Sequence, residues 1–443
     1  MRLPHPLVLM LGGIAVAAAL TWILPAGEFD RRDDPATGRR VAVAGSYHLV
    51  EPHPVGPFAA VVAIPRGFVE GAEVIGVVLF VGGAWVLVEH LGTLTAVVGA
   101  LVFFFRTRGL LAIPLVASFF AVMGALENMQ EEIIPLVPVL LVLGTGLGID
   151  PVAVLAMSGG AAMVGSAFGP TNPFQAGIAL KLAELPPFSG GLLRAAMFVL
   201  AVGAWIVFTM RYAARTRTTT EAGANVSVVY IETRHVVALA AMVVPMAIYV
   251  YGALRMNWGF NELSAAFFIG AMIAGLFGGL GLADCLVNYL EGMRALLPAA
   301  FMVGLARSIS LVLTDGRVVD SILNGLASPL AHLPGVATAF LMVPFHALVH
   351  VAVPSVSGQA VLTMPLMVPL ADLLGLSRQV PVLAYQVGAG LMELFTPTNG
   401  SIMALLLAAN VPYERWLRFA IAAAIIPLLV GFAGIAVAVW LGS

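Results

Sequence analysis

Two Pro-Thr-Asn tripeptides, at 170–172 and 397–399, carry the most informative chemistry of this chain. Proline removes a backbone donor and disrupts the preceding helical turn, so each tripeptide predicts an unwound break between two helices. The helix before a break leaves free carbonyl groups there, and the helix after it presents free N–H groups and the positive end of its dipole. We expect the first break (170–172) and the second break (397–399) to bind a carboxylate-bearing solute together with a small cation such as Na⁺.

The two breaks belong to one repeated pattern with a fixed shift. Position 397 lies 227 residues after position 170, and the same shift relates Gly148 to Gly375 and Pro138 to Pro365 without a gap. A repeat of this kind inside an apolar chain predicts two structural halves that meet around a shared site.

Each repeated unit begins with a polar stretch inside apolar sequence, the first tip at 127–132 and the second tip at 354–359. The apolar run after each tip ends at Gly148 or Gly375, and so falls short of the roughly 20 residues that cross a bilayer. Each unit is therefore predicted to form a re-entrant hairpin whose polar turn lies partway across the membrane.

The polar side chains of the tips and breaks form the predicted site for substrate and cations. They are Asn128, Gln130, Glu131, Glu132, Thr171, Asn172, Ser355, Ser357, Gln359, Glu393, Thr398 and Asn399. Glu393 precedes the second break by about one turn and takes the place of Ser166 in the first half. Glutamates at membrane depth usually face the interior, so they could bind a cation, a proton or a substrate amine. The alternative is that they lie at the membrane surface or pair with structural arginines.

Three further polar residues lie in apolar runs. Arg307 could bind a substrate carboxylate, but a fixed structural pairing with a buried glutamate is favoured. His346 and His350 have a spacing that can bind zinc, yet no third ligand motif accompanies them, so packing is favoured over a proton relay. The chain contains no Gly-x-Ser-x-Gly or His-Glu-x-x-His motif, and we do not expect an enzyme.

The composition limits which elements can position these residues. Of 443 residues 60% are hydrophobic and 10% charged, which predicts an all-α polytopic membrane protein. The net charge of −2, without a basic tail, argues against nucleic acid as a partner. The single cysteine, Cys285, excludes a disulfide framework and a Cys-rich metal site. We expect no cofactor beyond Na⁺ or H⁺ as coupling ion, and only a small-molecule substrate and membrane lipid as ligands.

The apolar runs predict about 11 to 13 crossings in two repeats. The predicted divisions are 1–210 for the first repeat (scaffold helices 1–126, hairpin and broken helix 127–184), 211–235 for a cytoplasmic linker, and 236–443 for the second repeat (scaffold helices 236–353, hairpin and broken helix 354–410, last helix 413–441). The arginine excess of the linker places it in the cytoplasm. The polar stretch 25–58 is predicted to be a short exposed loop or hairpin. If 92–105 is a crossing, the two halves have inverted topology.

The chain resembles the DcuC/YfcC-type (C4-dicarboxylate anaerobic carrier-like) family of the ion transporter superfamily, across nearly its whole length. The matching features are Leu24-Pro25-Ala26-Gly27-Glu28-Phe29, Glu131-Glu132 with Pro135, Asn172-Pro173-Phe174, Ser355 to Gln359, Met364-Pro365, and Pro412-Tyr413 followed by Trp416. The resemblance implies an inverted-repeat fold in which two re-entrant hairpins and two broken helices enclose substrate and sodium ions. It also implies a transport domain that moves as an elevator against a scaffold, in a homodimer of the inner cell membrane.

The resemblance also implies a role for individual residues. By position, one cation site would hold Asn128, Gln130, Thr171 and Asn172, and the other Ser355, Ser357, Thr398 and Asn399. One departure concerns the tips: where the superfamily's sodium/dicarboxylate symporters carry Ser-Asn-Thr, this chain has Glu-Asn-Met-Gln and Ser-Val-Ser-Gly.

The substrate is left open by two opposing indications. The family implies an ion-coupled secondary transporter of a C4-dicarboxylate. Unneutralised glutamates at the first tip would repel a dianion, and would instead favour an amino-acid ammonium or carry H⁺. The alternatives are therefore an amino-acid antiporter, for basic amino acids among others, and an H⁺-coupled carrier. An ion channel is more remote, because polarity concentrates at tips and breaks rather than along a continuous pore face.

Overall fold

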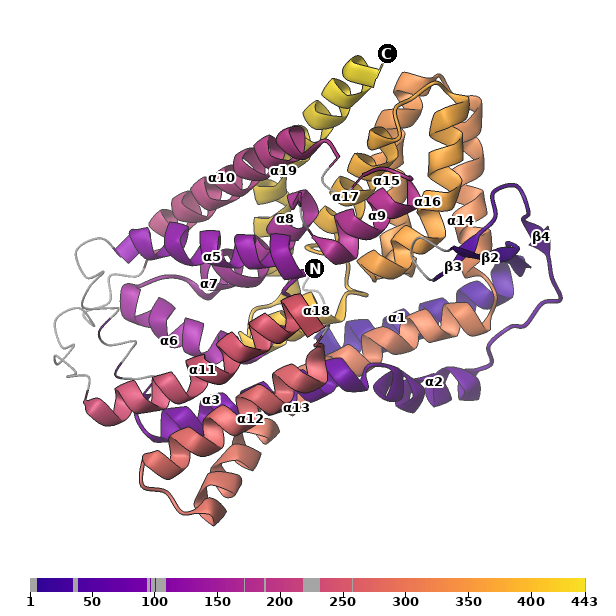
Figure 1. Cartoon of the computed structure of the whole chain (residues 1–443). Coiled ribbons are helices and arrows are strands. Elements are labelled where there is room, and N and C mark those ends of the chain that lie inside the picture. The colour runs from indigo at the N-terminus through magenta and orange to yellow at the C-terminus, as the bar shows by residue number, and fades with distance from the viewer. Residues whose placement is uncertain are drawn as a thin grey trace.

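The computed structural model describes residues 6–34, 39–93, 96, 100, 109–170, 172–186, 189–217, 232–256 and 258–442, and it is mostly helical (Figure 1). Its first helices are α1 (Pro6–Ile23), α2 (Pro57–Glu70), α3 (Ala72–His90), η1 (Gly109–Leu111), α5 (Ala112–Glu127), η2 (Glu131–Leu136), α6 (Val137–Leu147), α7 (Pro151–Leu155), η3 (Ala156–Gly160), α8 (Ala161–Phe168), η4 (Pro173–Gly177), α9 (Ile178–Leu182) and α10 (Gly191–Thr216). The later helices are α11 (Thr233–Met256), α12 (Phe260–Phe277), α13 (Leu282–Asp315), α14 (Val319–Ala327), η6 (Ser328–His332), α15 (Gly335–Ala352), α16 (Val356–Leu373), α17 (Gln379–Met392), α18 (Gly400–Ala408) and α19 (Tyr413–Gly442).

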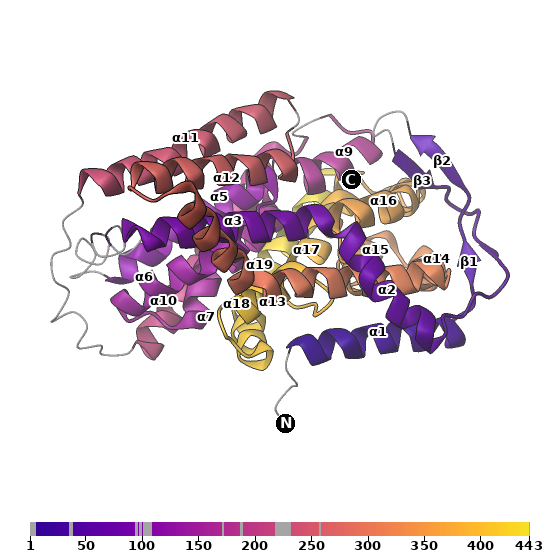
Figure 2. The ribbon, with the colours of Figure 1, turned by 90° about the horizontal axis from the view of Figure 1, so that it is seen from below.

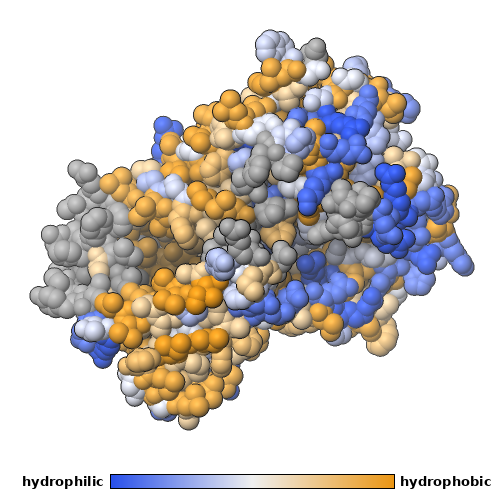
Figure 3. Space-filling model, in the orientation of Figure 1, coloured by the Kyte–Doolittle hydropathy of each residue, from blue (hydrophilic) through white to orange (hydrophobic). Residues whose placement is uncertain are grey.

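Nine helical segments within the described residues are long and apolar enough to cross a membrane. They are Ala72–His90, Gly109–Leu126, Pro151–Phe168, Gly191–Thr216, Phe260–Phe277, Leu282–Asp315, Gly335–Ala352, Val356–Leu373 and Tyr413–Gly442. Hydrophobic side chains cover the outer surface over α10, α11 and α12, whereas hydrophilic ones gather around the β-strands (Figure 3). The chain is therefore a multi-pass membrane protein. Much of the predicted crossing 92–105, and 218–231 of the predicted linker, lie outside the described residues.

One group of helices forms a layer built on the long helix α13. Helix α11 packs on α12, α12 on α3, α3 on α13, and α13 on α1, and Figure 2 shows them side by side in that order. A second group joins α5, α8, α10, α17 and α19, with α15 packed against α17. In this group Gly124 and Gly165 let α5 and α8 approach closely, since a Cβ at either residue would collide with a backbone carbonyl of the other helix.

The predicted breaks are interruptions between helices in the structure. Helix α8 ends at Phe168 and the next helical turn begins at Pro173; α17 ends at Met392 and α18 begins at Gly400. The asparagine of each break caps the helix that follows. The Asn172 Oδ1 accepts from the N–H groups of Phe174 and Gln175, at 2.9 and 3.0 Å, and the Asn399 Oδ1 accepts from that of Ser401 at 2.9 Å. Asparagine is a preferred N-cap, so local chemistry positions both breaks.

The two tips connect helices that pack differently. At the second tip α15 and α16 pack on each other, and the Ser355 hydroxyl caps α16 by accepting from the Gly358 N–H at 3.3 Å. At the first tip α5 ends in the left-handed residue Asn128, with φ of 58°. There α5 packs on α8, whereas η2 packs on α3 and α18, so the first tip extends between the two helix groups.

The described residues are mostly helical, and the stretch 25–58, predicted as a loop or hairpin, forms two short antiparallel strand pairs. Strand β1 (Gly27–Glu28) pairs antiparallel with β4 (His48–Leu49), and β2 (Arg31–Asp34) pairs antiparallel with β3 (Arg39–Ala42). Asp33 lies opposite Arg40 in the ladder, and opposite charges across strands stabilise such a pair. The hairpin is also less exposed than predicted, since Val41 is buried in an apolar cluster with side chains of α9, α16 and α17.

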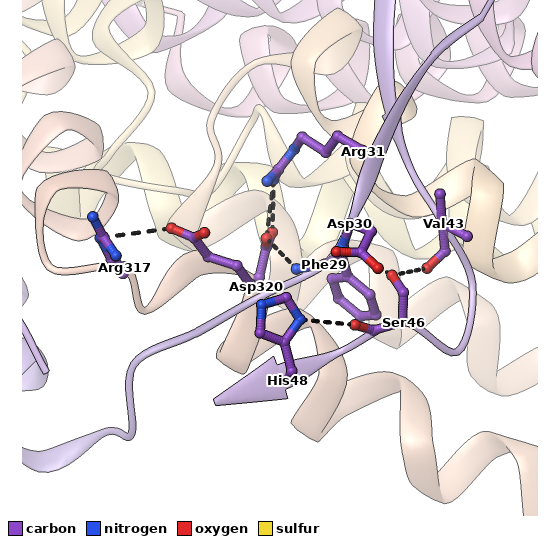
Figure 4. Close-up of polar contacts among 9 residues, drawn as sticks. Phe29, Asp30, Arg31, Val43, Ser46, His48, Arg317 and Asp320 are labelled. Atoms are coloured by element: carbon purple, nitrogen blue, oxygen red, sulfur yellow. Dashed lines mark hydrogen bonds and ion pairs between the residues drawn. The ribbon is translucent and has the colours of Figure 1, made fainter. Parts of the chain in front are cut away.

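The strand segment is fixed to the start of α14 through Asp320 (Figure 4). Asp320 is only 4% exposed, and both its oxygens accept from Arg31 Nη2 at 3.0 Å. The Phe29 N–H donates to the same carboxylate at 3.0 Å, and Arg317 lies 3.6 Å from Glu28. This buried carboxylate therefore links the segment between α1 and α2 to the second half of the chain.

Replacing Asp320 by alanine should reduce the free energy of unfolding by about 2 kcal/mol, because Arg31 and the Phe29 N–H lose a charged acceptor. Thermal unfolding of detergent-purified protein measures the change. Arg32→Ala, at an exposed neighbouring position, is the control and should stay within about 0.5 kcal/mol of the wild type. Equal losses of unfolding free energy in both variants would contradict the role of Asp320 in fixing the strand segment.

Candidate functional site

The first tip contacts residues beside both breaks. Asn128 Oδ1 accepts from Asn172 Nδ2 at 3.0 Å, beside the first break. Gln130 Nε2 donates to Glu393 Oε2 at 2.5 Å, and the Ser401 hydroxyl donates to Glu131 Oε1 at 2.9 Å, beside the second break. One short segment thus joins elements from the two halves of the chain.

Buried oxygen atoms converge at the first break. The Ser166 Oγ lies 2.5 Å from Asn128 Oδ1 and 3.1 Å from Gln175 Oε1, and it accepts from Asn172 Nδ2 at 2.9 Å. Ser166, Asn172 and Gln175 are fully buried. A hydroxyl has one proton, so Ser166 cannot donate to both amide oxygens at once. The oxygens of Asn128, Ser166 and Gln175 have two lone pairs each, so these neutral oxygens can coordinate a small cation in addition to their hydrogen bonds.

Beside the second break lies a carboxyl without a basic partner. Glu393 is 5% exposed, and within the described part of the chain no lysine, arginine or histidine forms an ion pair with it. Its carboxylate accepts from the Gln130 amide, while its backbone carbonyl accepts from Asn399 Nδ2 at 3.3 Å. A buried carboxylate without a counter-charge is costly, so this group can hold a proton or a small cation.

A cavity of about 500 Å³ opens between the tips and the layer built on α13. Its wall includes Glu73, Val74, Leu126, Asn128, Gln130, Glu131, Glu132, Phe174, Tyr249, Trp258, Gly259, Phe260, Arg307, Pro354, Ser355, Val356, Ser357, Glu393, Asn399 and Ser401. A smaller adjoining cavity shares Glu131, Arg307, Ser355, Asn399 and Ser401 with it. The volume suits a small metabolite.

Negatively charged side chains outnumber positively charged ones among the described residues of the cavity wall. Among the residues of the wall that the structure describes, four are glutamates, Glu73, Glu131, Glu132 and Glu393, and one is an arginine, Arg307. Arg307 forms no hydrogen bond or ion pair with any residue that the structure describes. The structural pairing that the sequence favours for Arg307 is therefore not found among the described residues, and its guanidinium lies on the cavity wall where it can meet a ligand.

Most of the predicted site residues line the cavity. Those on its wall are Asn128, Gln130, Glu131, Glu132, Ser355, Ser357, Glu393 and Asn399. Thr398 lines the smaller cavity and donates to the Val351 carbonyl at 2.8 Å, whereas Asn172 lies behind the first tip. Gln359 is fully buried inside the second hairpin, and Thr171 lies outside the described residues.

The two histidines lie with Gln359 and not on the cavity wall. His350 Nδ1 is 2.8 Å from Gln359 Oε1, and Gln359 Nε2 donates to the His346 carbonyl at 2.8 Å. Both rings are fully buried. No group of three metal-ligating His, Cys, Asp or Glu side chains occurs among the described residues, so their positions agree with packing.

Sequence reasoning missed several residues that complete the site. Gln175 and Ser401 were not singled out, although each lies in the first helical turn after a break. Ser166 was noted only as the counterpart of Glu393, yet it contacts both Asn128 and Asn172. The sequence pattern that could have identified these residues is a polar side chain within one helical turn of a break, because such a side chain can reach the backbone groups that the break leaves without helical partners.

A protein-family model and two known proteins match nearly the whole chain. The C4-dicarboxylate anaerobic carrier (DcuC) family matches residues 3–440 of the chain. YfcC of Escherichia coli (strain K12), which has the provisional name of a basic amino acid antiporter, is 28% identical over 466 residues, covering 94% of this chain and 92% of YfcC. An uncharacterised protein of Haemophilus influenzae is 25% identical over 474 residues, covering 94% of this chain and 93% of that protein.

Two solved structures are similar over almost the whole chain. The Alcanivorax borkumensis YdaH transporter has a TM-score of 0.44 at 19% identity, with 99% of this chain and 98% of that chain covered. Neisseria gonorrhoeae MtrF, described among antimetabolite efflux pumps, has a TM-score of 0.44 at 17% identity, with 99% and 96% covered. On the family match, which spans nearly all of its residues, this chain belongs to the C4-dicarboxylate anaerobic carrier (DcuC) family of secondary transporters.

Proposed function

We propose that this transporter is an ion-coupled carrier of amino acids, with basic amino acids preferred. The observation that supports this most is the charge of the cavity wall, where four glutamates face one unpaired arginine. An amino acid offers a carboxylate for Arg307 and an ammonium for Glu131 or Glu132. The provisional name of the relative YfcC supports the same substrate class.

Electrostatics distinguishes this substrate from a dianion. Two unit charges about 4 Å apart interact with about 4 kcal/mol at the effective dielectric of a partly buried site. A C4-dicarboxylate would gain one such attraction from Arg307 but meet repulsion from Glu131 and Glu132. A substrate with a net positive charge gains from both glutamates.

A C4-dicarboxylate is the second candidate, because specific features favour it. The family is described by this substrate class, and Arg307 is a cation suited to a carboxylate. The N-terminus of α18 at Asn399 adds donors and a positive dipole end to the same wall. Protonation of Glu131 and Glu132 would remove their repulsion of a dianion and would therefore favour a C4-dicarboxylate.

The coupling ions are assigned to two places. The oxygen cluster around Ser166 would take Na⁺, and Glu393 would take H⁺ or a second cation. Na⁺ suits the first because the ligands offered are neutral oxygens at a helix break. The second is a carboxyl that lacks a basic partner in the part of the chain described, so binding of one positive charge would neutralise it.

We further propose that the tips and breaks belong to an inverted-repeat transport domain that moves as an elevator. The cavity supports this, because one wall comes from α3, α12 and α13 and the other from tips and breaks. The packing of α5 on α8, and of α15 on α17, supports adding these helices to the moving part. A homodimer in the inner membrane stays a prediction from the family resemblance.

A ligand screen by thermal unfolding should give its largest stabilisation with a basic amino acid, because only a ligand that binds the folded state raises its melting temperature. Purified protein is tested against basic amino acids, neutral amino acids and C4-dicarboxylates, each in Na⁺ and in choline. Stabilisation by a C4-dicarboxylate alone would contradict the proposed substrate. A lack of Na⁺ dependence would contradict sodium binding at the first break.

Arg307→Gln should weaken binding of an amino acid by about 10-fold or more, because a charged hydrogen bond to the carboxylate is lost. The affinity for the matching amine without a carboxylate should not fall, because the amine loses no partner and the repulsion of its ammonium by Arg307 is removed. Arg294→Gln, an exposed arginine on the same helix α13, is the control and should bind both ligands normally. Equal losses for the amino acid and its amine would show that Arg307 does not contact the carboxylate.

Asn399→Ala and Asn172→Ala should each abolish uptake into proteoliposomes while leaving a folded protein. Each change removes an N-cap, worth about 1 kcal/mol, and a polar group at a helix break. Asn288→Ala on α13, away from the cavity wall, should transport like the wild type. Wild-type uptake by both variants would contradict the assignment of the two helix breaks to the transport site.

A further inference from the structure

A fully buried arginine lies outside the cavity wall, in the first turn of α10. Arg194 is 1% exposed, and none of the described carboxylates forms an ion pair with it. Its Nη1 donates to Gln386 Oε1, its Nη2 donates to Gln379 Oε1 at 3.2 Å, and its Nε finds no partner. A buried charge without a counter-charge costs several kcal/mol, and a charged residue in a membrane span usually serves function.

Hydrogen bonds connect Arg194 to the first break. The Gln386 side-chain amide, which accepts from Arg194, donates through Nε2 to the Gly169 carbonyl at 3.1 Å. The Gln386 backbone carbonyl accepts from Gln175 Nε2 at 3.2 Å. Gln175 Oε1 then lies 3.1 Å from the Ser166 hydroxyl. The connection therefore ends in the oxygen cluster beside Asn128.

The charge of Arg194 fixes the orientation of the Gln386 side-chain amide. A guanidinium can only donate, so the oxygen of the Gln386 amide must face Arg194 and its NH₂ must face Gly169. The NH₂ of Gln175 is held separately, by the Gln386 backbone carbonyl, and this leaves the Gln175 oxygen directed at Ser166. With Gln386 reversed, two oxygens would meet at Gly169 and the backbone before the break would shift.

We propose that Arg194 is a positioning residue for the cation site at the first break, acting through the orientation of the Gln386 amide. The inference rests on the proposed function, because it requires that the oxygens of Asn128, Ser166 and Gln175 bind a cation. Arg194 touches neither substrate nor cation in this account. Its role is to hold the Gln386 amide so that its NH₂ keeps the Gly169 carbonyl, and with it the backbone before the break, in place.

Two effects of Arg194 on cation affinity have opposite signs. Its positive charge repels a cation, so a role through charge alone predicts tighter Na⁺ binding when Arg194 is neutralised. A role through the orientation of Gln386 predicts weaker Na⁺ binding when Arg194 is neutralised. Reversal of the Gln386 amide would shift the Gly169 backbone beside the break and so misplace the oxygen ligands. The direction of the change in Na⁺ affinity therefore separates the two effects, and a general loss of packing would not by itself change that affinity.

Thermal unfolding of the full-length protein, titrated with NaCl against choline chloride, measures this affinity. Arg194→Gln should raise the Na⁺ concentration for half-maximal stabilisation by about 10-fold, and Arg194→Lys, which keeps a charged donor, should raise it less. Arg211→Gln, an exposed arginine on the same helix, is the matched control and should leave it unchanged. Unchanged or tighter Na⁺ binding in Arg194→Gln would overturn the inference.

Gln386→Glu tests the same inference if Arg194→Gln does not fold. The new carboxylate gives Arg194 a counter-charge but removes the amide donor to the Gly169 carbonyl, so Na⁺ affinity should again fall about 10-fold. Unchanged affinity in this variant would overturn the inference. A wild type without any Na⁺-induced stabilisation would instead overturn the cation site itself, an outcome visible before any variant is compared.

Discussion

The contact of the first tip with both breaks is the constraint on which the rest of the site depends. Asn128 is bonded to Asn172 and Gln130 to Glu393, so two broken helices from distant parts of the chain are held against one short polar segment. Because polar groups in an apolar medium must find partners, these contacts also determine where the backbone can open. The cavity, the oxygen cluster and the buried carboxyl all adjoin this segment.

The two breaks offer different chemistry to a ligand although they share one sequence pattern. Where the first half has Ser166 among neutral amide oxygens, the second has Glu393, whose carboxyl meets the Gln130 amide. The neutral site suits a permanent cation and the carboxyl suits an exchangeable positive charge. Arg307 on the facing helix α13 adds the positive charge that a substrate carboxylate requires. The proposed coupling ions follow from this asymmetry, and the proposed substrate class follows from the charges of the cavity wall.

Sequence reasoning reached the breaks and tips because local chemistry encodes them. Proline and an N-capping asparagine interrupt a helix wherever the chain folds, so the breaks near Asn172 and Asn399 were predictable. Partners were not predictable in the same way. Gln130 and Glu393 are 263 residues apart, and nothing local indicates that they meet. The same limit applies to Arg307, since its position on the cavity wall without a partner among the described residues is a tertiary property. It also applies to the strands between α1 and α2, whose docking depends on Asp320.

The most direct test of the central claim is an experimental structure of the protein with a transported amino acid bound. We predict density for the ligand between the two tips, with its carboxylate at Arg307 and its ammonium at Glu131 or Glu132. Density elsewhere, for example in the polar cavity lined by Glu28, Arg66 and Arg317, would contradict the account.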